Sequence, residues 1–237
     1  MIQLHDLCLA YGERRLLDNA NATFDRGTLT ALIGRNGSGK STLLRAIAAL
    51  NRRYTGTIAI DGTDTLRLNA SEMARLLAVV TTERVRIGNF SCRDVVATGR
   101  APYTNWTGRL SAADNAIVDE AIATAGIEQF ASRSISTLSD GEAQRVMIAR
   151  AIAQQTPVML LDEPTSFLDL PSRRHLAALL RRLATETGRC IIFSTHELDL
   201  ATEFATSIAL IDHATLTHLP TSQALVSTLL DPLLNPT

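Results

Sequence analysis

A loop near the start of the chain combines glycines, a lysine and two hydroxyl side chains in an order that suits phosphate binding. Residues 34–42 read Gly-Arg-Asn-Gly-Ser-Gly-Lys-Ser-Thr and fit the P-loop pattern G-x-x-x-x-G-K-[ST]. An apolar run precedes the loop and a helix-like apolar period follows it, and phosphates bind where a strand turns into a helix. The predicted nucleotide-binding residues of this loop are Gly34, Asn36, Gly37, Ser38, Gly39, Lys40, Ser41 and Thr42.

These residue types each supply a different contact to a polyphosphate. The glycines let backbone N–H groups approach the phosphates closely. Lys40 supplies a point charge, and Ser41 offers its hydroxyl to Mg²⁺. The sequence therefore predicts that the chain binds a nucleoside triphosphate together with Mg²⁺.

Two adjacent carboxylates follow another apolar run. Asp162 and Glu163 come directly after Val-Met-Leu-Leu at residues 158–161, and open α/β sheets bind ligands at the carboxyl ends of their strands. Mg²⁺ accepts one or two carboxylates together with phosphate oxygens, so we expect Asp162 in its shell. The alternation of a strand should turn Glu163 to the other side, where it could polarise an attacking water.

Strand-like and helix-like segments alternate along the chain and must position these groups. Short β-type runs lie at residues 2–10, 28–33, 57–60, 77–81, 158–161 and 190–194. Helical periodicity dominates residues 39–50, 111–125, 139–154 and 171–187. Ser111 and Ser139 each precede a helix and have an acidic residue three positions later (Asp114 and Glu142), which is typical of helix N-caps.

This pattern predicts an α/β fold built on a P-loop NTPase core. We expect a mostly parallel sheet, an N-terminal antiparallel β portion and an inserted helical subdomain, because residues 84–154 contain helices and loops but no convincing strand. The whole chain is then one domain, with the nucleotide-binding core formed by residues 1–83 and 155–237.

Composition and charge limit the class of protein. The chain has 237 residues, 46% of them hydrophobic, and its net charge of −1 gives no bulk attraction to nucleic acid or to an anionic membrane. Its three dispersed cysteines read as reduced thiols. The start of the chain has no signal-peptide pattern, and no apolar run approaches the ~20 residues of a membrane helix. We expect a soluble protein that reaches a membrane only through a partner.

Three further motifs identify a family. Residues 138–145 read Leu-Ser-Asp-Gly-Glu-Ala-Gln-Arg, residues 166–169 read Ser-Phe-Leu-Asp, and residues 194–197 read Ser-Thr-His-Glu. With these motifs the chain resembles the ATP-binding subunits of ABC transporters, whose signature reads Leu-Ser-Gly-Gly-Gln. The resemblance runs from Ile2 to about Asp212, which is almost the whole chain.

The resemblance implies a role for each catalytic residue. Lys40 and the loop amides hold the β- and γ-phosphates of ATP, while Ser41 and Asp162 hold Mg²⁺. Glu163 acts as the general base, and His196 contacts the γ-phosphate. Phosphoryl transfer needs mainly positioning and charge neutralisation from a protein, which these residue types supply.

The resemblance also implies a homodimer that sandwiches two ATP molecules. Tyr11 matches the position where the family stacks an aromatic ring on adenine. Ser139 and Gly141 close over the γ-phosphate from the other subunit, since one chain cannot fold its own signature onto its own P-loop. Ser139 precedes a helix, and the N-terminus of a helix favours an anion.

The chain departs from the family pattern at two places. The Gln that usually closes the strand before the helical subdomain is missing; Thr82 lies nearest to its place, with Glu83 beside it. Either residue could contact the metal shell directly or through water. The alternative is a substituted loop in which the coupling of ATP hydrolysis is weaker. In the signature, Asp140 replaces a Gly and Glu142 replaces the Gln, and Glu142 is expected to form a capping box with Ser139.

The helical subdomain suggests a subgroup and a partner. Gly-Arg-Ala-Pro at residues 99–102 and Gly-Arg-Leu-Ser at 108–111 resemble the iron-siderophore, haem and cobalamin importers. Tyr103 and Trp106 either pack in the core or, exposed with Arg100, dock a partner helix. The resemblance implies multi-helix permease subunits, indirectly a substrate-binding protein, and a peripheral location at the cytoplasmic face of the inner membrane.

Three alternatives remain at this stage. An exporter, or an importer of another cargo, shares every catalytic residue. A soluble ABC-type ATPase acting on nucleic acid or ribosomes usually carries two cassettes, long insertions or a basic arm, and none of these is visible here. A P-loop kinase does not explain the signature or His196. We therefore predict the ATPase of an importer without a nucleic-acid partner. The subgroup resemblance implies a metal chelate such as a ferric siderophore or haem as the cargo, with cobalamin or a free metal ion as alternatives.

Overall fold

A computed structural model describes residues 1–82, 88, 90–105, 108–226 and 230 of the chain. A six-stranded sheet in the order β10-β9-β3-β8-β7-β6 forms its centre, and all neighbouring strands pair in parallel except β10 with β9. Its strands are β3 (Leu29–Gly34), β6 (Leu77–Val80), β7 (Val158–Leu161), β8 (Cys190–Ser194), β9 (Ser207–Asp212) and β10 (Thr215–Pro220). The expected mostly parallel sheet is confirmed.

The central strands are apolar because both faces of the sheet are covered. Every residue of β3, β7 and β8 is buried, which explains why these strands read as continuous apolar runs in the sequence. Since parallel strands deliver their carboxyl ends to one edge of the sheet, the residues that follow β3, β6, β7 and β8 lie at the same edge. This edge carries the P-loop and the two acidic residues.

A second, antiparallel sheet is formed mainly by the N-terminal part of the chain, as expected. It has the order β2-β1-β4-β5 and packs against the central sheet through one of two apolar clusters. Its strands are β1 (Ile2–Tyr11), β2 (Arg14–Phe24), β4 (Tyr54–Ile60) and β5 (Thr63–Asp64). A tight turn at Gly12, whose φ is +59°, joins β1 to β2 and brings Tyr11 opposite Arg14. Helix α1 (Lys40–Ile47) contributes its apolar face to the same cluster.

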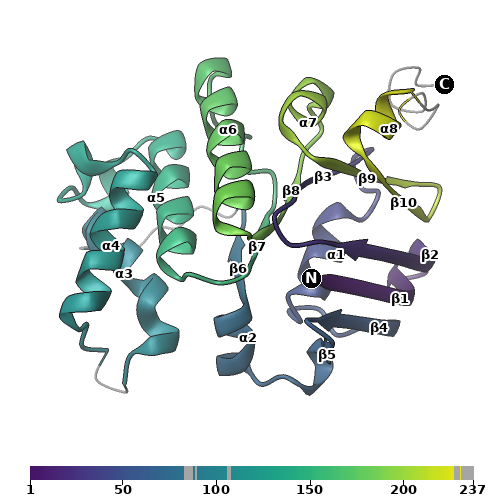
Figure 1. Ribbon diagram of the computed structural model, residues 1–237, viewed down its shortest axis with the longest axis horizontal. Coiled ribbons are helices and arrows are strands. Elements are labelled where there is room, and N and C mark those ends of the chain that lie inside the picture. The colour runs from purple at the N-terminus through teal and green to yellow at the C-terminus, as the bar shows by residue number, and fades with distance from the viewer. Residues whose placement is uncertain (83–87, 89, 106–107, 227–229, 231–237) are drawn as a thin grey trace.

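Helices cover the face of the central sheet that the antiparallel sheet leaves free, and a group of helices lies beyond one end of the central sheet. Figure 1 shows α3, α4 and α5 grouped beyond β6, and α6 and α7 lying along the sheet. The helices are α2 (Ala70–Leu76), α3 (Cys92–Ala97), α4 (Ala112–Thr124), α5 (Asp140–Ala153), α6 (Leu170–Thr187), α7 (Leu198–Phe204) and α8 (Thr221–Val226). In the described part of the chain between β6 and β7, the regular elements are helical, as expected for an inserted helical subdomain. The bounds 84–154 for that subdomain stay a prediction.

Local capping defines where α4 and α5 begin. The Ser111 and Ser139 hydroxyls each accept a hydrogen bond from the backbone N–H three residues later. The carboxylates of Asp114 and Glu142 in turn accept a hydrogen bond from the backbone N–H of the capping serine. Both N-caps expected from the sequence are confirmed, as is the capping box of Ser139 with Glu142; Ser111 forms a capping box as well. Hydrogen bonds from Ser139 hold the pKa of Glu142 below its usual value.

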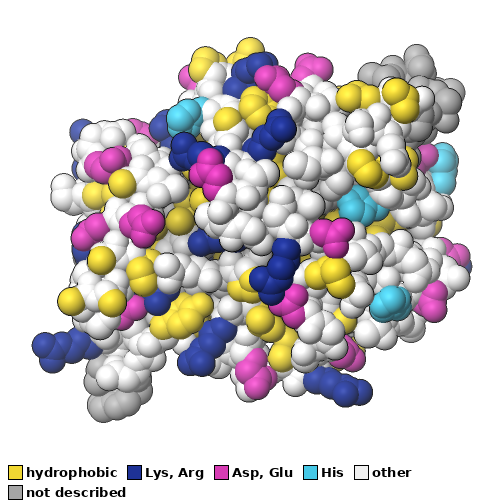
Figure 2. All heavy atoms as spheres, viewed as in Figure 1, with side chains coloured by type: hydrophobic (Ala, Val, Ile, Leu, Met, Phe, Trp, Pro, Cys, Tyr) yellow, Lys and Arg dark blue, Asp and Glu magenta, His cyan; other side chains and the backbone are white. Residues whose placement is uncertain are grey.

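The surface carries charges of both signs. On the face shown in Figure 2, basic and acidic side chains are interspersed, in keeping with the near-zero net charge. None of the helices within the described ranges is both long enough and apolar enough to span a bilayer.

Candidate active site

A cleft of about 330 Å³ lies between the N-terminal hairpin and the start of α1. The residues that line it are Tyr11, Arg14, Leu16, Asn36, Gly37, Gly39, Lys40, Ser41, Thr42 and Glu163. Most of the residues predicted to bind nucleotide therefore face one space. Arg14 and Leu16 were not predicted; the hairpin that begins β2 carries them to the P-loop, and neither belongs to a motif.

The glycines give the P-loop its shape. Gly34, Gly37 and Gly39 have φ values of +153°, +77° and +109°, a region that other residues rarely adopt. A Cβ on Gly34 would lie 2.6 Å from both the Ile211 carbonyl oxygen and the Ser38 hydroxyl, so a side chain has no room there. Gly39 caps α1 without any side-chain hydrogen bond, which leaves the first N–H groups of the helix for a ligand.

Lys40 is buried beneath this loop. Its ammonium donates to the Gly34 carbonyl at 2.8 Å and to the Arg35 carbonyl at 3.3 Å, so the side chain bridges the start of the loop and can offer a third N–H to a phosphate. Burial lowers the pKa of Lys40, and the nearby carboxylates of Glu163 and Asp162 act in the opposite direction. The residue that the motif predicts to carry charge is thus held inside the loop.

Three elements meet at Asp162. Its backbone N–H donates to the Val80 carbonyl at 2.8 Å and so holds the residue against the end of β6. Its Oδ1 accepts hydrogen bonds from the Ser41 hydroxyl at 3.0 Å and from the Ser194 hydroxyl at 2.7 Å. Ser41 and Asp162, which the sequence predicts to share a metal, are therefore in direct contact. Their hydroxyl and carboxylate oxygens are hard donors that fit Mg²⁺, which is commonly held by one or two protein oxygens plus phosphate oxygens and water.

Glu163 lines the cleft and has an unusual backbone conformation. Its φ is +44°, and it falls beyond the end of β7, so the strand alternation from which we predicted its direction does not extend to this residue. Its backbone N–H donates to the Ser194 hydroxyl at 2.8 Å, and its Oε2 accepts from the Ser166 hydroxyl at 3.1 Å. The left-handed backbone conformation and these two hydrogen bonds together fix the direction of the Glu163 carboxylate.

Ser194 is the central group that sequence reasoning missed. Its hydroxyl donates to Asp162 and accepts from the Glu163 backbone, so it fixes both acidic residues at once. It is fully buried at the end of β8. In the sequence, Ser194 closes an apolar run and opens the Ser-Thr-His-Glu motif, but neither feature shows that it contacts the acidic pair.

The other predicted residues lie in four different places. Tyr11 is 78% exposed at the edge of the cleft, and His196 is exposed in the turn after β8. Thr82 follows β6 in a bend and is half-buried, whereas Glu83 lies outside the described residues. Ser139 and Gly141 begin α5, and none of the described residues that line the cleft belongs to that helix. A Cβ on Gly141 would meet Leu168 at 2.9 Å, so α5 begins against the segment that follows Glu163.

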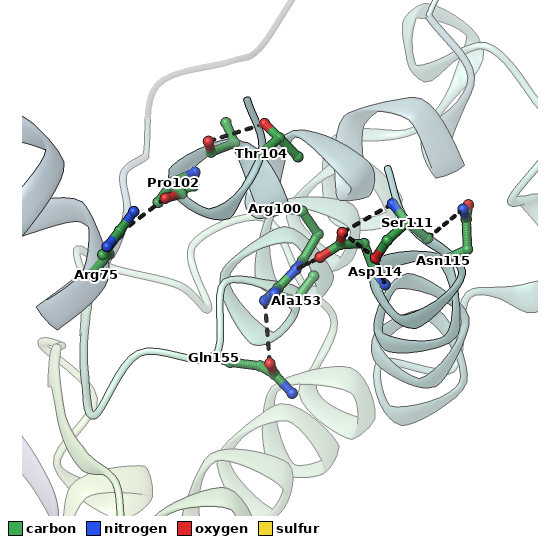
Figure 3. Close-up of polar contacts among 10 residues, drawn as sticks. Arg75, Arg100, Pro102, Thr104, Ser111, Asp114, Asn115, Ala153 and Gln155 are labelled. Carbon is green, nitrogen blue, oxygen red and sulfur yellow. Dashed lines mark hydrogen bonds and ion pairs between the residues drawn. The ribbon is translucent and has the colours of Figure 1, made fainter. Parts of the chain in front are cut away.

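Arg100 is not an exposed docking residue, contrary to one of our two expectations (Figure 3). It is 6% exposed, and its guanidinium donates to Asp114 Oδ1 at 2.9 Å, to the Ala153 carbonyl at 2.9 Å and to Gln155 Oε1 at 3.2 Å. It also lies 4.2 Å from the centre of the Tyr103 ring. One side chain thus joins the Gly-Arg-Ala-Pro segment to the start of α4 and the end of α5. Trp106 lies outside the described residues.

Comparison with known proteins agrees with this geometry. A family model described as ABC transporter matches residues 17–166. An uncharacterised ABC transporter ATP-binding protein of Methanocaldococcus jannaschii is 40% identical over 211 residues, 89% of this chain and 73% of the relative. The iron(3+)-hydroxamate import ATP-binding protein of Bacillus subtilis is 34% identical over 204 residues, 86% of this chain and 76% of the relative.

Solved structures show the same fold. An inward-facing metal-chelate type ABC transporter superposes with a TM-score of 0.85 at 26% identity, covering 98% of this chain and 88% of that chain. A dimeric ATP-binding cassette in a post-hydrolysis state with ADP and Pi gives a TM-score of 0.80 at 27% identity, covering 93% of this chain and 99% of that chain.

The P-loop, the acidic pair and the fold define an ATP-hydrolysing enzyme of the P-loop class. More narrowly, the chain belongs to the ABC transporter family and is an ATP-binding subunit of that family.

Proposed function

We propose that this chain is the ATPase subunit of an importer for a metal chelate and that it works as a homodimer. The observation that carries the catalytic part is the cluster of Ser41, Asp162, Ser194 and Glu163 at the open edge of the sheet, beside the P-loop. Support for the cargo class comes from the iron(3+)-hydroxamate relative and from the metal-chelate type transporter of the same fold. Cobalamin remains the alternative cargo.

Each residue of the cluster has one task in this proposal. The Lys40 ammonium and the loop N–H groups bind the β- and γ-phosphates. Ser41 and Asp162 would hold Mg²⁺, which neutralises phosphate charge when it is bound. Glu163 accepts the proton of the attacking water, and Ser166 and Ser194 keep its carboxylate and backbone in place for that step. Thr82, or Glu83, would reach the same shell.

The remaining contacts to ATP come from the edge of the cleft and from a second copy. Tyr11 stacks on the adenine, and His196 reaches the γ-phosphate from the turn after β8. Ser139 and Gly141 of the second copy close over that phosphate with the N-terminus of α5, since α5 of the same chain does not reach the cleft among the described residues. A dimeric cassette of the same fold supports this arrangement.

The proposed partners follow from the importer assignment. The dimer binds multi-helix permease subunits at the cytoplasmic face of the membrane and serves a substrate-binding protein indirectly, without a nucleic-acid partner. ATP binding closes the dimer, and hydrolysis releases it, so that the nucleotide-held interface is the switch.

A pull-down with an ATP-trapped subunit tests this function. The Glu163→Gln protein is purified with ATP from its native membranes in mild detergent, and Lys40→Met, which should not hold ATP, serves as the control. We expect a multi-helix permease and a substrate-binding protein with Glu163→Gln and much less with Lys40→Met. Recovery of ribosomes or DNA-bound proteins, without a membrane protein, would overturn the transporter assignment.

A further inference from the structure

The segment after β7 holds the carboxylate of Glu163 from one side. In this segment, residues 163–169, the Ser166 hydroxyl donates to Glu163 Oε2 at 3.1 Å. The Ser166 backbone N–H also donates to the Glu163 carbonyl, and the Leu168 N–H donates to the Thr165 carbonyl, so the segment is a series of tight turns. The direction of the Glu163 carboxylate therefore depends on where these turns sit.

Two charged side chains outside the cleft hold the turns in place. Arg173, in the second turn of α6, donates from Nε to the Leu168 carbonyl at 2.7 Å and from Nη1 to Glu197 Oε2 at 2.9 Å. Glu197 uses its other oxygen to accept from the Thr165 hydroxyl at 2.9 Å. The pair thus forms two hydrogen bonds with the 163–169 segment, one to a backbone carbonyl and one from a side-chain hydroxyl.

The same pair is joined to the turn that carries His196. Glu197 directly follows that histidine and precedes α7, and its backbone N–H donates to the Thr195 hydroxyl at 3.0 Å. The side chains of Arg173 and Glu197 are 33% and 17% exposed, so solvent screens their attraction only partly. Charge-assisted bonds of this kind are about twice as strong as neutral ones.

We propose that Arg173 and Glu197 are positioning residues for ATP hydrolysis. They hold the 163–169 segment so that Ser166 orients the Glu163 carboxylate, and they fix that segment relative to the turn of His196. Neither residue is among those that line the cleft, and their described hydrogen bonds go to each other and to Thr165, Leu168 and Thr195, so we expect the pair to act on the chemical step and not on nucleotide binding. This inference rests on the proposed role of Glu163 as general base.

The next residue of α6 provides a matched control. Arg174 pairs with Glu203, so a second Arg–Glu pair joins α6 to α7. The side chains of this pair are 51% and 41% exposed, and Arg174 contacts Glu203 and the ring of Phe204, both outside the 163–169 segment. Loss of this pair removes a similar surface charge from the same helices without releasing the turns.

Steady-state ATP hydrolysis by the full-length protein tests the proposal. Arg173→Met and Glu197→Gln should each lower kcat on the order of tenfold, because small misplacements of a catalytic group cost rates of that size, while KM for ATP stays within about twofold. Arg173→Lys should give an intermediate kcat, since a lysine can reach Glu197 but cannot make both bonds in a fixed fork. Arg174→Met should behave as the wild type.

Two measurements separate positioning from a loss of folded protein. Glu197→Gln keeps the shape of the side chain and an acceptor for Thr165, and its melting temperature and its affinity for a fluorescent ATP analogue should stay near those of Arg174→Met. A kcat for Glu197→Gln equal to that of Arg174→Met overturns the proposal. A fall in kcat that merely follows the folded fraction also overturns it.

The variant Glu163→Gln distinguishes a failure of the positioning proposal from a failure of the proposed role of Glu163 as general base. If that variant is inactive and the Arg173 and Glu197 variants are normal, only the positioning proposal fails. If Glu163→Gln hydrolyses ATP at the wild-type rate, the role of Glu163 fails and the positioning proposal fails with it.

Discussion

The buried hydroxyl of Ser194 offers the sharpest test of how the site is held together. Ser194→Ala removes the donor to Asp162 and leaves the Glu163 backbone N–H without its acceptor. A hydrogen bond to a charged group contributes about 1.5–3 kcal/mol, and a buried donor left unpaired costs about 1–3 kcal/mol. Because Glu163 lines the cleft and water can reach it there, we expect the free energy of unfolding to fall by the sum of the two lower bounds, roughly 2.5 kcal/mol. At roughly 2–4 °C per kcal/mol for a chain of this size, the melting temperature should fall by about 5–10 °C.

The assay is urea unfolding followed by far-UV circular dichroism, with a buried neutral pair as the control. Thr30 and Ser207 share a hydrogen bond of 2.8 Å in the same sheet, and Ser207 keeps His218 as a second partner at 3.0 Å. Thr30→Val should therefore cost only about 1 kcal/mol. If Ser194→Ala costs no more than Thr30→Val at an unchanged m-value, the argument that Ser194 holds both acidic residues is refuted.

Three further perturbations have defined outcomes. Gly34→Ala should weaken ATP binding by about tenfold or more, measured with a fluorescent analogue, because the residue has φ +153° and no room for a Cβ; normal affinity would contradict this. Burial lowers the pKa of His218, so below about pH 6.5 the unfolded chain binds a proton more readily than the folded chain. The contribution of neutral His218 to the free energy of unfolding should therefore be full above about pH 6.5 and fall as the pH drops below it. The variant His218→Gln should lose that pH dependence. Hydrogen bonds from Ser111, and to a smaller extent one from the Arg100 guanidinium, hold the pKa of Asp114 at about 2. The variant Arg100→Met should raise this pKa in an NMR titration. An unchanged pKa would show that the Arg100 contact has no electrostatic effect.

The sequence was most informative where function restricts residue types. The P-loop glycines need positive φ values, and Lys40 and Ser41 must follow them at fixed positions, so a single pattern located the loop and the helix behind it. Strands β3, β7 and β8 were recognisable because burial on both faces leaves few polar positions, whereas β9, which also pairs in parallel with β3, was missed. The N-caps at Ser111 and Ser139 were recognisable because each bond of a capping box lies within four residues.

Contacts between residues far apart in sequence could not be predicted in the same way. Ser194 is a common residue at the end of a strand, and only the pairing of β7 with β8 brings it between Asp162 and Glu163. Strand β2 and its residue Arg14 were missed because half of that strand is exposed and polar, so its apolar pattern is weak. The left-handed turn at Glu163 likewise depends on the tertiary bonds that hold it.

The measurement that tests the account most directly is ATP hydrolysis by the wild type and by Glu163→Gln at equal ATP occupancy, with mass measured by light scattering in the same samples. We expect kcat to fall by about 10²–10⁴ while the affinity for ATP is unchanged, because the carboxylate serves only the proton transfer. We also expect Glu163→Gln to accumulate as a dimer in ATP and to return to monomer when ATP is removed. Hydrolysis at the wild-type rate by Glu163→Gln would contradict the account.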